Sequence, residues 1–367
     1  MTARTQLIPA RPAPARATGP AVWLRRNFAG SLPNTVFTLL ILLLLGWLAA
    51  SGWRWGVQQA VFKPDADLCQ AARGLGACWG VIPEKARFIL LGRYPQTESW
   101  RPELATLALL VPVFASCIQR FWKPWLALVW LAGFGVFFVL MGGGVLGLSA
   151  VPTDRWGGLP LTILLSVTSM AFAFPIAVVV ALGRRSKLPA IKTLCVAYVE
   201  LARGVPLISV LFMASFMFPL FMPVGKSPDV LVRVIVGITL FAAAYMAEIV
   251  RGGLQTVSRG QGEAAASLGL GYWQAQRKIM LPQALATVVP GIVNNFISLF
   301  KDTSLVTIVS LYELTGALSL ALGSDPNWRP FKIEAYIFIA AIYFACCFAM
   351  SRYSLRIEKR LARSHAH

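Results

Sequence analysis

The chain has 367 residues, of which 57% are hydrophobic and only 13% are charged. Soluble globular domains carry about a quarter charged residues, so this composition excludes an ordinary soluble enzyme. The formal net charge of +19 indicates either a nucleic-acid partner or a membrane protein with basic cytoplasmic loops. The two histidines, His365 and His367, lie at the C-terminal end, so neither histidine-based catalysis nor a metal site is expected.

The N-terminal part predicts a basic arm followed by one membrane span. Residues 1–34 carry five arginines and no acid among many Ala and Pro, which is typical of a disordered arm. Residues 36–50 are almost entirely apolar and predict a first span. A cleaved signal peptide is the alternative, because residues 49–52 are small. Residues 51–101 are polar and should form an outer loop.

Further apolar stretches of spanning length follow along the chain. A bilayer core requires about 20 mostly apolar residues per helix, because only a helix satisfies its own backbone hydrogen bonds there. The sequence therefore predicts an all-α integral membrane protein with about eight transmembrane helices. The expected spans after the first cover residues 102–118, 125–148, 159–182, part of 191–221, 230–250, 285–300 and 335–350.

Residues 304–322 are ambiguous, because they are apolar but contain Tyr312, Glu313 and Gly316. With eight spans both termini are cytoplasmic, and the inner segments hold 20 Lys and Arg residues and two acids. The outer segments hold 13 basic and 11 acidic residues, which follows the positive-inside tendency. A ninth span would move the basic tail outside. We therefore interpret residues 304–322 as a re-entrant or surface-lying helix, and the excess charge as an orientation signal rather than a nucleic-acid site.

The longest predicted inner loop, residues 251–283, carries a motif with long, position-specific spacing. A carboxylate such as Glu263 in the first turn of a helix complements the helix dipole, and the alanines that follow favour a smooth helix. Gly269 can end that helix with a positive φ, and Pro282 suits the first turn of the next span. The motif residues are Glu263, Ala264, Ala265, Gly269, Ile279, Leu281 and Pro282.

This spacing resembles, without a mismatch, the EAA loop in the membrane subunits of ATP-binding-cassette (ABC) importers. Residues 198–207, 247–254 and 301–305 are similar to further signatures of the polar amino-acid uptake permeases. The likeness covers about residues 159–356 and implies a type I ABC importer core of five helices, preceded by three extra helices. Residues 1–158 resemble the larger subunits of general L-amino-acid transporters, although few motif residues carry that match.

The resemblance implies a permease subunit in the bacterial inner membrane that takes up L-amino acids delivered by a periplasmic binding protein. A separate cytoplasmic ATPase dimer would bind the EAA loop and hold ATP and Mg, so this chain is expected to be no enzyme and to carry no cofactor. A second permease subunit, either a paralogue or another copy, should lie beside it in the lipid. The expected regions are a cytoplasmic basic arm (1–34), an N-terminal extension (35–158), the permease core (159–356) and a cytoplasmic tail (357–367).

An ion-coupled secondary amino-acid transporter is the alternative function. Such a transporter would be expected to show internal repeats and acids in mid-membrane. The acids in the predicted spans instead lie near span ends beside arginines. Glu200/Arg203 and Glu248/Arg251 are both spaced i,i+3, so each pair can neutralise its own charge on one helix face. Direct contact with substrate is the other role open to these four residues.

Polar residues form a stripe along the predicted span 285–300 and just beyond it. Such groups avoid lipid, so they should face a cavity or another helix. A zwitterionic amino acid needs acceptors for its ammonium group, such as Asp302 and the Asn carbonyls, and donors for its carboxylate, such as Lys301. Packing between helices is the alternative for the Asn pair. The expected substrate pathway comprises Asn294, Asn295, Ser298, Lys301, Asp302, Thr303 and Ser304.

Two of the six cysteines, Cys69 and Cys78, lie in the predicted outer loop. An oxidising periplasm permits a disulfide between them. A bridge and two free thiols remain equal alternatives from the sequence.

Overall fold

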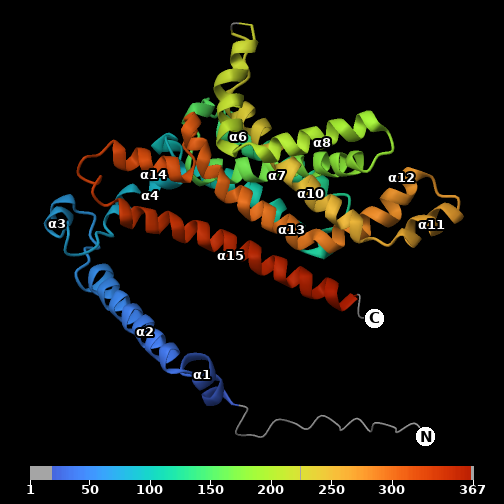
Figure 1. Cartoon of the computed structure of the whole chain (residues 1–367). Coiled ribbons are helices and arrows are strands. Elements are labelled where there is room, and N and C mark those ends of the chain that lie inside the picture. Colours follow the sequence, from blue (N-terminus) through green and yellow to red (C-terminus); the bar gives the residue numbers. More distant parts are fainter. Residues whose placement is uncertain (1–18, 224, 365–367) are drawn as a thin grey trace, which may run out of the picture. The chain divides into compact units, whose positions relative to one another are not determined.

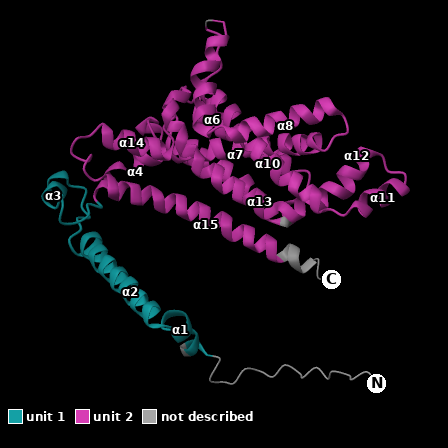
Figure 2. Cartoon of the chain, viewed as in Figure 1, with its two compact units in different colours: residues 1–79 teal, residues 80–367 magenta. Residues whose placement is uncertain are grey.

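The computed structural model describes residues 19–223 and 225–364, and the chain divides into two compact units, residues 1–79 and 80–367. Figure 1 shows the elements of the chain, and Figure 2 shows the two units in different colours. Most of the expected basic arm and the end of the expected tail, with His365 and His367, lie outside the described residues. The regular structure of the described residues is helical, apart from two isolated β-bridges.

Unit 1 is a long apolar helix followed by a small disulfide-bonded loop. Its elements are α1 (Pro20–Phe28), α2 (Leu32–Trp53), the π-helical turn η2 (Arg54–Gln58) and α3 (Ala66–Ala71). Together α2 and η2 are 27 residues long and apolar enough to cross a bilayer, in agreement with the first expected span. A disulfide joins Cys69 and Cys78. The indole N–H of Trp79 donates to the carbonyl of Gly56 at 2.8 Å, which ties the loop to the end of η2.

Unit 2 contains the remaining helices. Among the described residues of the whole chain, five helices are long and apolar enough to span a bilayer, and a bent pair of helices provides a sixth span. Two further helices, α5 and α6, have 17 residues each, which is about 25 Å and at the short end for a span. The elements of unit 2 are α4 (Val81–Leu91), η3 (Gln96–Glu98), α5 (Trp100–Ser116), η4 (Gln119–Phe121), α6 (Leu126–Gly142), η5 (Thr153–Arg155), α7 (Gly158–Arg184), α8 (Pro189–Gly204), α9 (Leu207–Phe212), η6 (Met213–Met217), η7 (Phe218–Phe221), α10 (Val230–Thr256), α11 (Arg259–Ser267), α12 (Tyr272–Ala275), η8 (Gln276–Met280), α13 (Leu281–Asp302), η9 (Thr303–Val309), α14 (Leu314–Gly323) and α15 (Lys332–Ser364).

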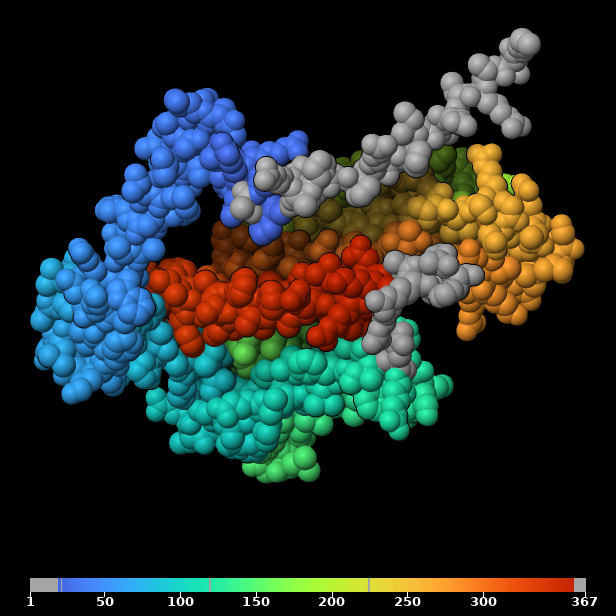
Figure 3. All heavy atoms as spheres, turned by 90° about the horizontal axis from the view of Figure 1, so that it is seen from below, coloured from blue at the N-terminus to red at the C-terminus, as the bar shows by residue number. Residues whose placement is uncertain are grey.

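The centre of unit 2 is the packed pair α7 and α10. Fully buried alanines lie along both helices, including Ala177 on α7 and Ala244 on α10, so the two backbones approach closely. α8 packs beside α10 and α7, α13 packs against α10, and α15 packs against α13 (Figure 1). Figure 3 shows α15 as a red band across one face, with the gold and orange connection between α10 and α13 beyond one of its ends.

The fifth expected span is broken rather than continuous. α8 ends at Gly204 and the run of α9, η6 and η7 begins at Leu207, with a bend of 104° between them. Pro206 has no backbone N–H to continue the helix, and a residue that precedes proline avoids the helical region. Accordingly, Val205 is extended, with φ −113° and ψ 137°. We call residues 203–207 the α8–α9 elbow.

Residues 304–322 do not form a surface-lying helix, so that one of the two expected arrangements is wrong, and the re-entrant arrangement stays a prediction. α14 has ten residues, about 15 Å, which is too short to span a bilayer. Leu314, Ala317 and Leu318 are fully buried, and the helix packs against α4 and α7. The segment is therefore a short helix inside the protein. Its apolar character reflects burial under α4, a helix of the N-terminal extension.

A buried carboxylate holds the start of α14. Glu313 is fully buried and accepts hydrogen bonds from the backbone N–H groups of Thr315 and Gly316, both at 2.9 Å. It also accepts from the hydroxyls of Thr307 (3.2 Å) and Tyr343 (2.8 Å). These donors belong to η9, α14 and α15, so one side chain joins three elements. At the sequence level Glu313 indicated only that the segment was ambiguous.

The helices of the extension that lie in unit 2 are fastened to the core by charged contacts. Lys85 on α4 lies 2.7 Å from Asp325 in the turn between α14 and α15, and this hydrogen bond is the main reason that the pKa of Asp325 is lowered. Arg93 lies over the ring of Tyr312, 5.2 Å from its centroid. Residues 80–158 are therefore part of the same compact unit as the core.

Replacing Glu313 by Ala should destabilise the protein. The change leaves at least three donors buried without an acceptor, and each orphaned group costs about 1–3 kcal/mol. We expect the detergent-solubilised protein to unfold several degrees lower, as measured by a thermal unfolding assay. Glu103→Ala is the matched control, because Glu103 is exposed on α5 and its loss should change little. Equal melting temperatures for the two variants would contradict the role of Glu313.

Candidate functional site

A cavity of about 290 Å³ lies between α9, α10 and α13, and we call it the α10–α13 cavity. Its volume is close to the lower limit of ordinary ligand pockets, about 300 Å³. Its amide and carboxylate groups come from α13, whereas α9 and α10 supply apolar and aromatic walls. The lining residues are Leu207, Phe241, Ala242, Tyr245, Asn295, Ser298, Leu299, Asp302 and Leu305.

Three residues of the expected substrate pathway, Asn295, Ser298 and Asp302, line this cavity together. The side-chain oxygen of Asn295 is buried and has no hydrogen-bond partner within the described residues. Asp302 likewise forms no ion pair with any described residue. Acceptors without a protein partner thus lie at this cavity, although the Asn295 oxygen is covered by its neighbours in this structure, and such acceptors suit a ligand with N–H or O–H donors.

The other residues of the expected pathway do not face this cavity. Lys301 and Ser304 line a second cavity of about 380 Å³ together with Thr315, Tyr336, Ile339, Ala340 and Tyr343. Thr303 is fully buried and donates to the carbonyl of Phe300 at 2.8 Å, which closes the end of α13. Asn294 is exposed and lines neither cavity. Consecutive residues of a helix point about 100° apart, so Lys301 and Asp302 cannot serve one small pocket as we expected.

Charged residues gather at the ends of α7, α8 and α10. Glu248 on α10 accepts from Arg251 at 2.9 Å, as the i,i+3 spacing predicts, and also from Arg184 at the end of α7. Arg203 on α8 lies 3.7 Å from Glu248, and Glu200 lies 3.2 Å from Arg184. We call these five residues the Glu248 cluster.

The expected pairing of Glu200 with Arg203 is therefore wrong. Each of these residues pairs with a different helix instead: Glu200 with Arg184 and Arg203 with Glu248. The physical reason is that Arg184, at the end of α7, comes between the two acids and attracts both. Charge neutralisation at this edge is a property of three packed helices, not of one helix face.

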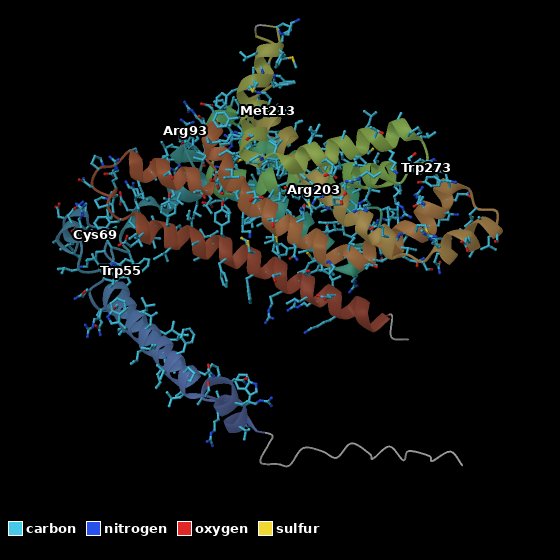
Figure 4. All side chains as sticks on the ribbon, viewed as in Figure 1. Trp55, Cys69, Arg93, Arg203, Met213 and Trp273 are labelled. Atoms are coloured by element: carbon cyan, nitrogen blue, oxygen red, sulfur yellow. A yellow bond between two sulfur atoms is a disulfide. The ribbon has the colours of Figure 1, made fainter. Side chains whose placement is uncertain are left out.

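The Glu248 cluster adjoins one end of the α10–α13 cavity. The guanidinium of Arg203 lies over the ring of Tyr245, 5.7 Å from its centroid, and Tyr245 lines the cavity. Figure 4 labels Arg203 near the end of α8. Beyond this point α10 and α13 touch closely, since a Cβ on Gly291 would lie 3.1 Å from Ile249. A Cβ on Gly253 would lie only 2.6 Å from the carbonyl oxygen of Ala284. The two helices are therefore in close contact between the cavity and the α10–α13 connection.

The α10–α13 connection, residues 257–280, contains the EAA motif except for Leu281 and Pro282, which form the first turn of α13. Its first helix, α11, begins at Arg259 after Ser258, a residue type that helix N-caps prefer, so Glu263 lies in the second turn and not in the first as expected. Gly269 has φ +74° and ends α11 as predicted, with its N–H donating to the carbonyl of Ala266. The expected second helix runs through η8 directly into α13, so this arm of the connection and α13 form one continuous helix.

An apolar patch is exposed on this otherwise polar connection. Leu268 is 78% exposed, Trp273 71% and Tyr272 54%. Arg277 and Lys278 are exposed nearby in the chain. Figure 4 places Trp273 on α12, at the tip of the connection. Large apolar side chains that protrude beside charges are typical of a surface that binds another protein.

Sequence reasoning missed several residues that the structure brings to the site. Leu207, Phe241 and Tyr245 line the cavity, yet each belongs to an apolar stretch with no distinguishing pattern. Arg184 looked like one member of a basic group that closes a span. The one available signal was Tyr245, which stands one helical turn before Glu248 and so on the same face.

Residues 173–363, just over half of the chain, match the family described as "Binding-protein-dependent transport system inner membrane component". The chain belongs to this family. It is a multi-pass inner-membrane protein and the permease subunit of an ABC importer.

Proteins similar along their full length include two named permeases. The inner membrane amino-acid ABC transporter permease protein YhdY of Escherichia coli K12 is 43% identical over 96% of both chains. The glutamate/glutamine/aspartate/asparagine transport system permease protein BztC of Rhodobacter capsulatus is 37% identical and covers 99% of this chain and 98% of that protein. The extension before the core is therefore shared with these relatives. The alternative of an ion-coupled transporter finds no support here.

Shorter relatives match the core alone. The probable glutamine ABC transporter permease protein GlnP of Bacillus subtilis is 33% identical over 56% of this chain and 92% of that protein. A solved structure described as an amino acid ABC transporter with histidines is 30% identical, with a TM-score of 0.49, over 55% of this chain and 92% of that chain.

Glu248→Gln should destabilise the protein more than Glu200→Gln. The first change removes the carboxylate that three arginines share, whose side chain is only 18% exposed. Leaving such charges unpaired costs on the order of 2 kcal/mol at a partly buried site. Glu200 is 60% exposed, so its pair with Arg184 should contribute less than about 1 kcal/mol. Thermal unfolding in detergent measures both, and an equal loss for the two variants would argue against Glu248 as the centre of the cluster.

Proposed function

We propose that this permease carries amino acids. The observation that supports this best is the similarity along nearly the whole chain to YhdY and BztC, both of which are named as amino-acid permeases. The α10–α13 cavity agrees with such a substrate, because Asn295 and Asp302 offer the acceptors that an ammonium group requires. The chemistry is binding and release, and it requires no cofactor held by this chain.

A separate ATPase dimer binds the α10–α13 connection in this proposal, and ATP and Mg are bound by that dimer. The exposed residues Leu268, Tyr272 and Trp273 supply an apolar contact surface, and Glu263, Arg277 and Lys278 supply charges around it. The connection suits this role because its second arm is continuous with α13 and its first arm follows α10. A push on the connection would therefore act on both helices that line the cavity.

Two further partners complete the proposed transporter. A second permease subunit, either a paralogue or another copy, faces this chain, since one chain offers one connection while two ATPase domains close together. A binding protein delivers the amino acid on the opposite side of the membrane. We place both termini of the chain in the cytoplasm, because the segments between expected spans then carry nearly all of the excess positive charge on the inner side.

Uptake by the assembled complex tests the proposal. The permease, its ATPase and its binding protein would be co-expressed, purified and reconstituted into proteoliposomes, with each labelled L-amino acid supplied outside. We expect at least one amino acid to accumulate when ATP is present with the ATPase, and no accumulation with a non-hydrolysable analogue. Uptake driven by an ion gradient without ATP would contradict the proposal and favour a secondary transporter.

The role of the cavity is tested separately in the same assay. Asp302→Asn keeps the shape of the side chain but removes its charge, and we expect uptake to fall at least tenfold with the complex intact. Asn294→Ala is the matched control, because Asn294 stands on the same helix but outside both cavities. Normal uptake by the Asp302 variant would contradict a role for the Asp302 charge in transport.

A further inference from the structure

Of the three arginines in the Glu248 cluster, Arg203 forms the longest contact with Glu248. Arg184 and Arg251 both donate hydrogen bonds to Glu248, whereas Arg203 approaches it only to 3.7 Å, and its side chain is 41% exposed. A guanidinium has five N–H donors in a rigid fork. Within the described residues, this guanidinium lies 3.7 Å from Glu248 and stacks on the ring of Tyr245. Most of its donors are therefore available to another anion.

The position of Arg203 places these donors beside the α10–α13 cavity. Arg203 begins the α8–α9 elbow, and Leu207 at the other end of the elbow lines the cavity. Tyr245, on which Arg203 stacks, is itself a wall of that cavity. A Cβ on Gly204 would meet no atom within 4 Å, and the elbow is exposed from Arg203 to Pro206 and buried at Leu207. The guanidinium therefore lies against a wall of the cavity without lining the cavity itself.

The neighbouring acceptor is Asn295. α10 and α13 run in opposite directions, with Ile249 against Gly291, so one helical turn further along each helix brings Tyr245 level with Asn295. Asn295 therefore lines the same end of the cavity as Tyr245, and Arg203 lies against that end through its stacking on Tyr245. Asp302 stands about 10 Å further along α13. The ammonium and carboxylate of an amino acid share one carbon, so Arg203 and Asn295 can bind them together and Arg203 and Asp302 cannot.

We propose that Arg203 binds the α-carboxylate of the transported amino acid at the end of the cavity next to the Glu248 cluster, while Asn295 accepts from the α-ammonium group. This inference rests on the proposed function. Glu248 is the competing anion: Arg203 turns to the substrate when the cavity is filled, and returns to Glu248 when it is empty. No additional charged residue is needed for this change, because the Arg203 guanidinium pairs with a carboxylate in both states: that of the substrate when the cavity is filled and that of Glu248 when it is empty. Lys301 cannot substitute, since it lines the other cavity.

The proposal makes the α-carboxylate the recognised group, so the test varies that group. Binding is measured on the purified complex of permease and ATPase in nanodiscs without the binding protein, which would otherwise set the apparent affinity. The probes are the L-amino acid with the fastest uptake in the panel and its α-carboxamide, which lacks the negative charge. We expect the wild-type complex to bind the acid at least tenfold more tightly than the amide.

Variants of Arg203 then test whether this side chain causes the tighter binding of the acid. The Arg203→Gln complex should bind the acid at least tenfold more weakly than the wild type does, and its ratio of affinities for acid and amide should fall close to one. Arg203→Lys should recover part of the preference, because it restores the charge without the fork. Arg251→Lys is the matched control from the same cluster, and its preference should equal that of the wild type. The basal ATPase rate of each complex reports whether the variant assembles.

Two outcomes would overturn the inference while leaving the proposed function intact. Equal affinity of the wild-type complex for acid and amide would do so without any variant, even if an Arg203 substitution fails to assemble. An unchanged preference in Arg203→Gln would do so as well. Failure of the wild-type complex to bind or take up any amino acid would instead remove the proposed function itself.

Discussion

The carboxylate of Glu248 is the contact on which the site depends. It stands near the end of a long apolar helix, where isolated charges are costly, and it holds arginines from α7, from α8 and from its own helix. Together with the Arg184–Glu200 pair and the stacking of Arg203 on Tyr245, this carboxylate fixes where α8 ends relative to α10. The α8–α9 elbow follows directly, and with it Leu207, Arg203 and one end of the α10–α13 cavity.

Close packing connects that cavity to the α10–α13 connection. Gly253 and Gly291 allow α10 and α13 to approach closely, so the two helices pack tightly against each other. The arm formed by α12 and η8 continues into α13 without a break. A force on the connection would therefore be transmitted along α13 to Asn295 and along α10 to Tyr245. In the proposed transporter, these paths would carry the action of the ATPase to the cavity.

Predictions from the sequence were confirmed for features that depend on neighbouring residues. They were wrong for contacts that depend on segments far away in the chain. The apolar runs predicted the spans, the spacing from Glu263 to Pro282 indicated the family, and Gly269 ends α11 with the expected positive φ. The pairing of Glu200 with Arg203 was wrong because Arg184 attracts the acid from another helix. Of the two arrangements expected for residues 304–322, the surface-lying one was wrong because α4, more than 200 residues earlier, covers α14.

The sequence by itself determined the class of the protein, its spans and the motif of its connection, because hydropathy and motif spacing are properties of contiguous residues. Only the tertiary structure decided that Asn295 and Asp302 share a cavity while Lys301 enters another, that Glu313 joins three elements, and that Arg203 stacks on Tyr245. These relations depend on how each helix is rotated about its axis and on where α8 breaks. Packing against other helices sets both, and the residues that do the packing lie far away in the chain.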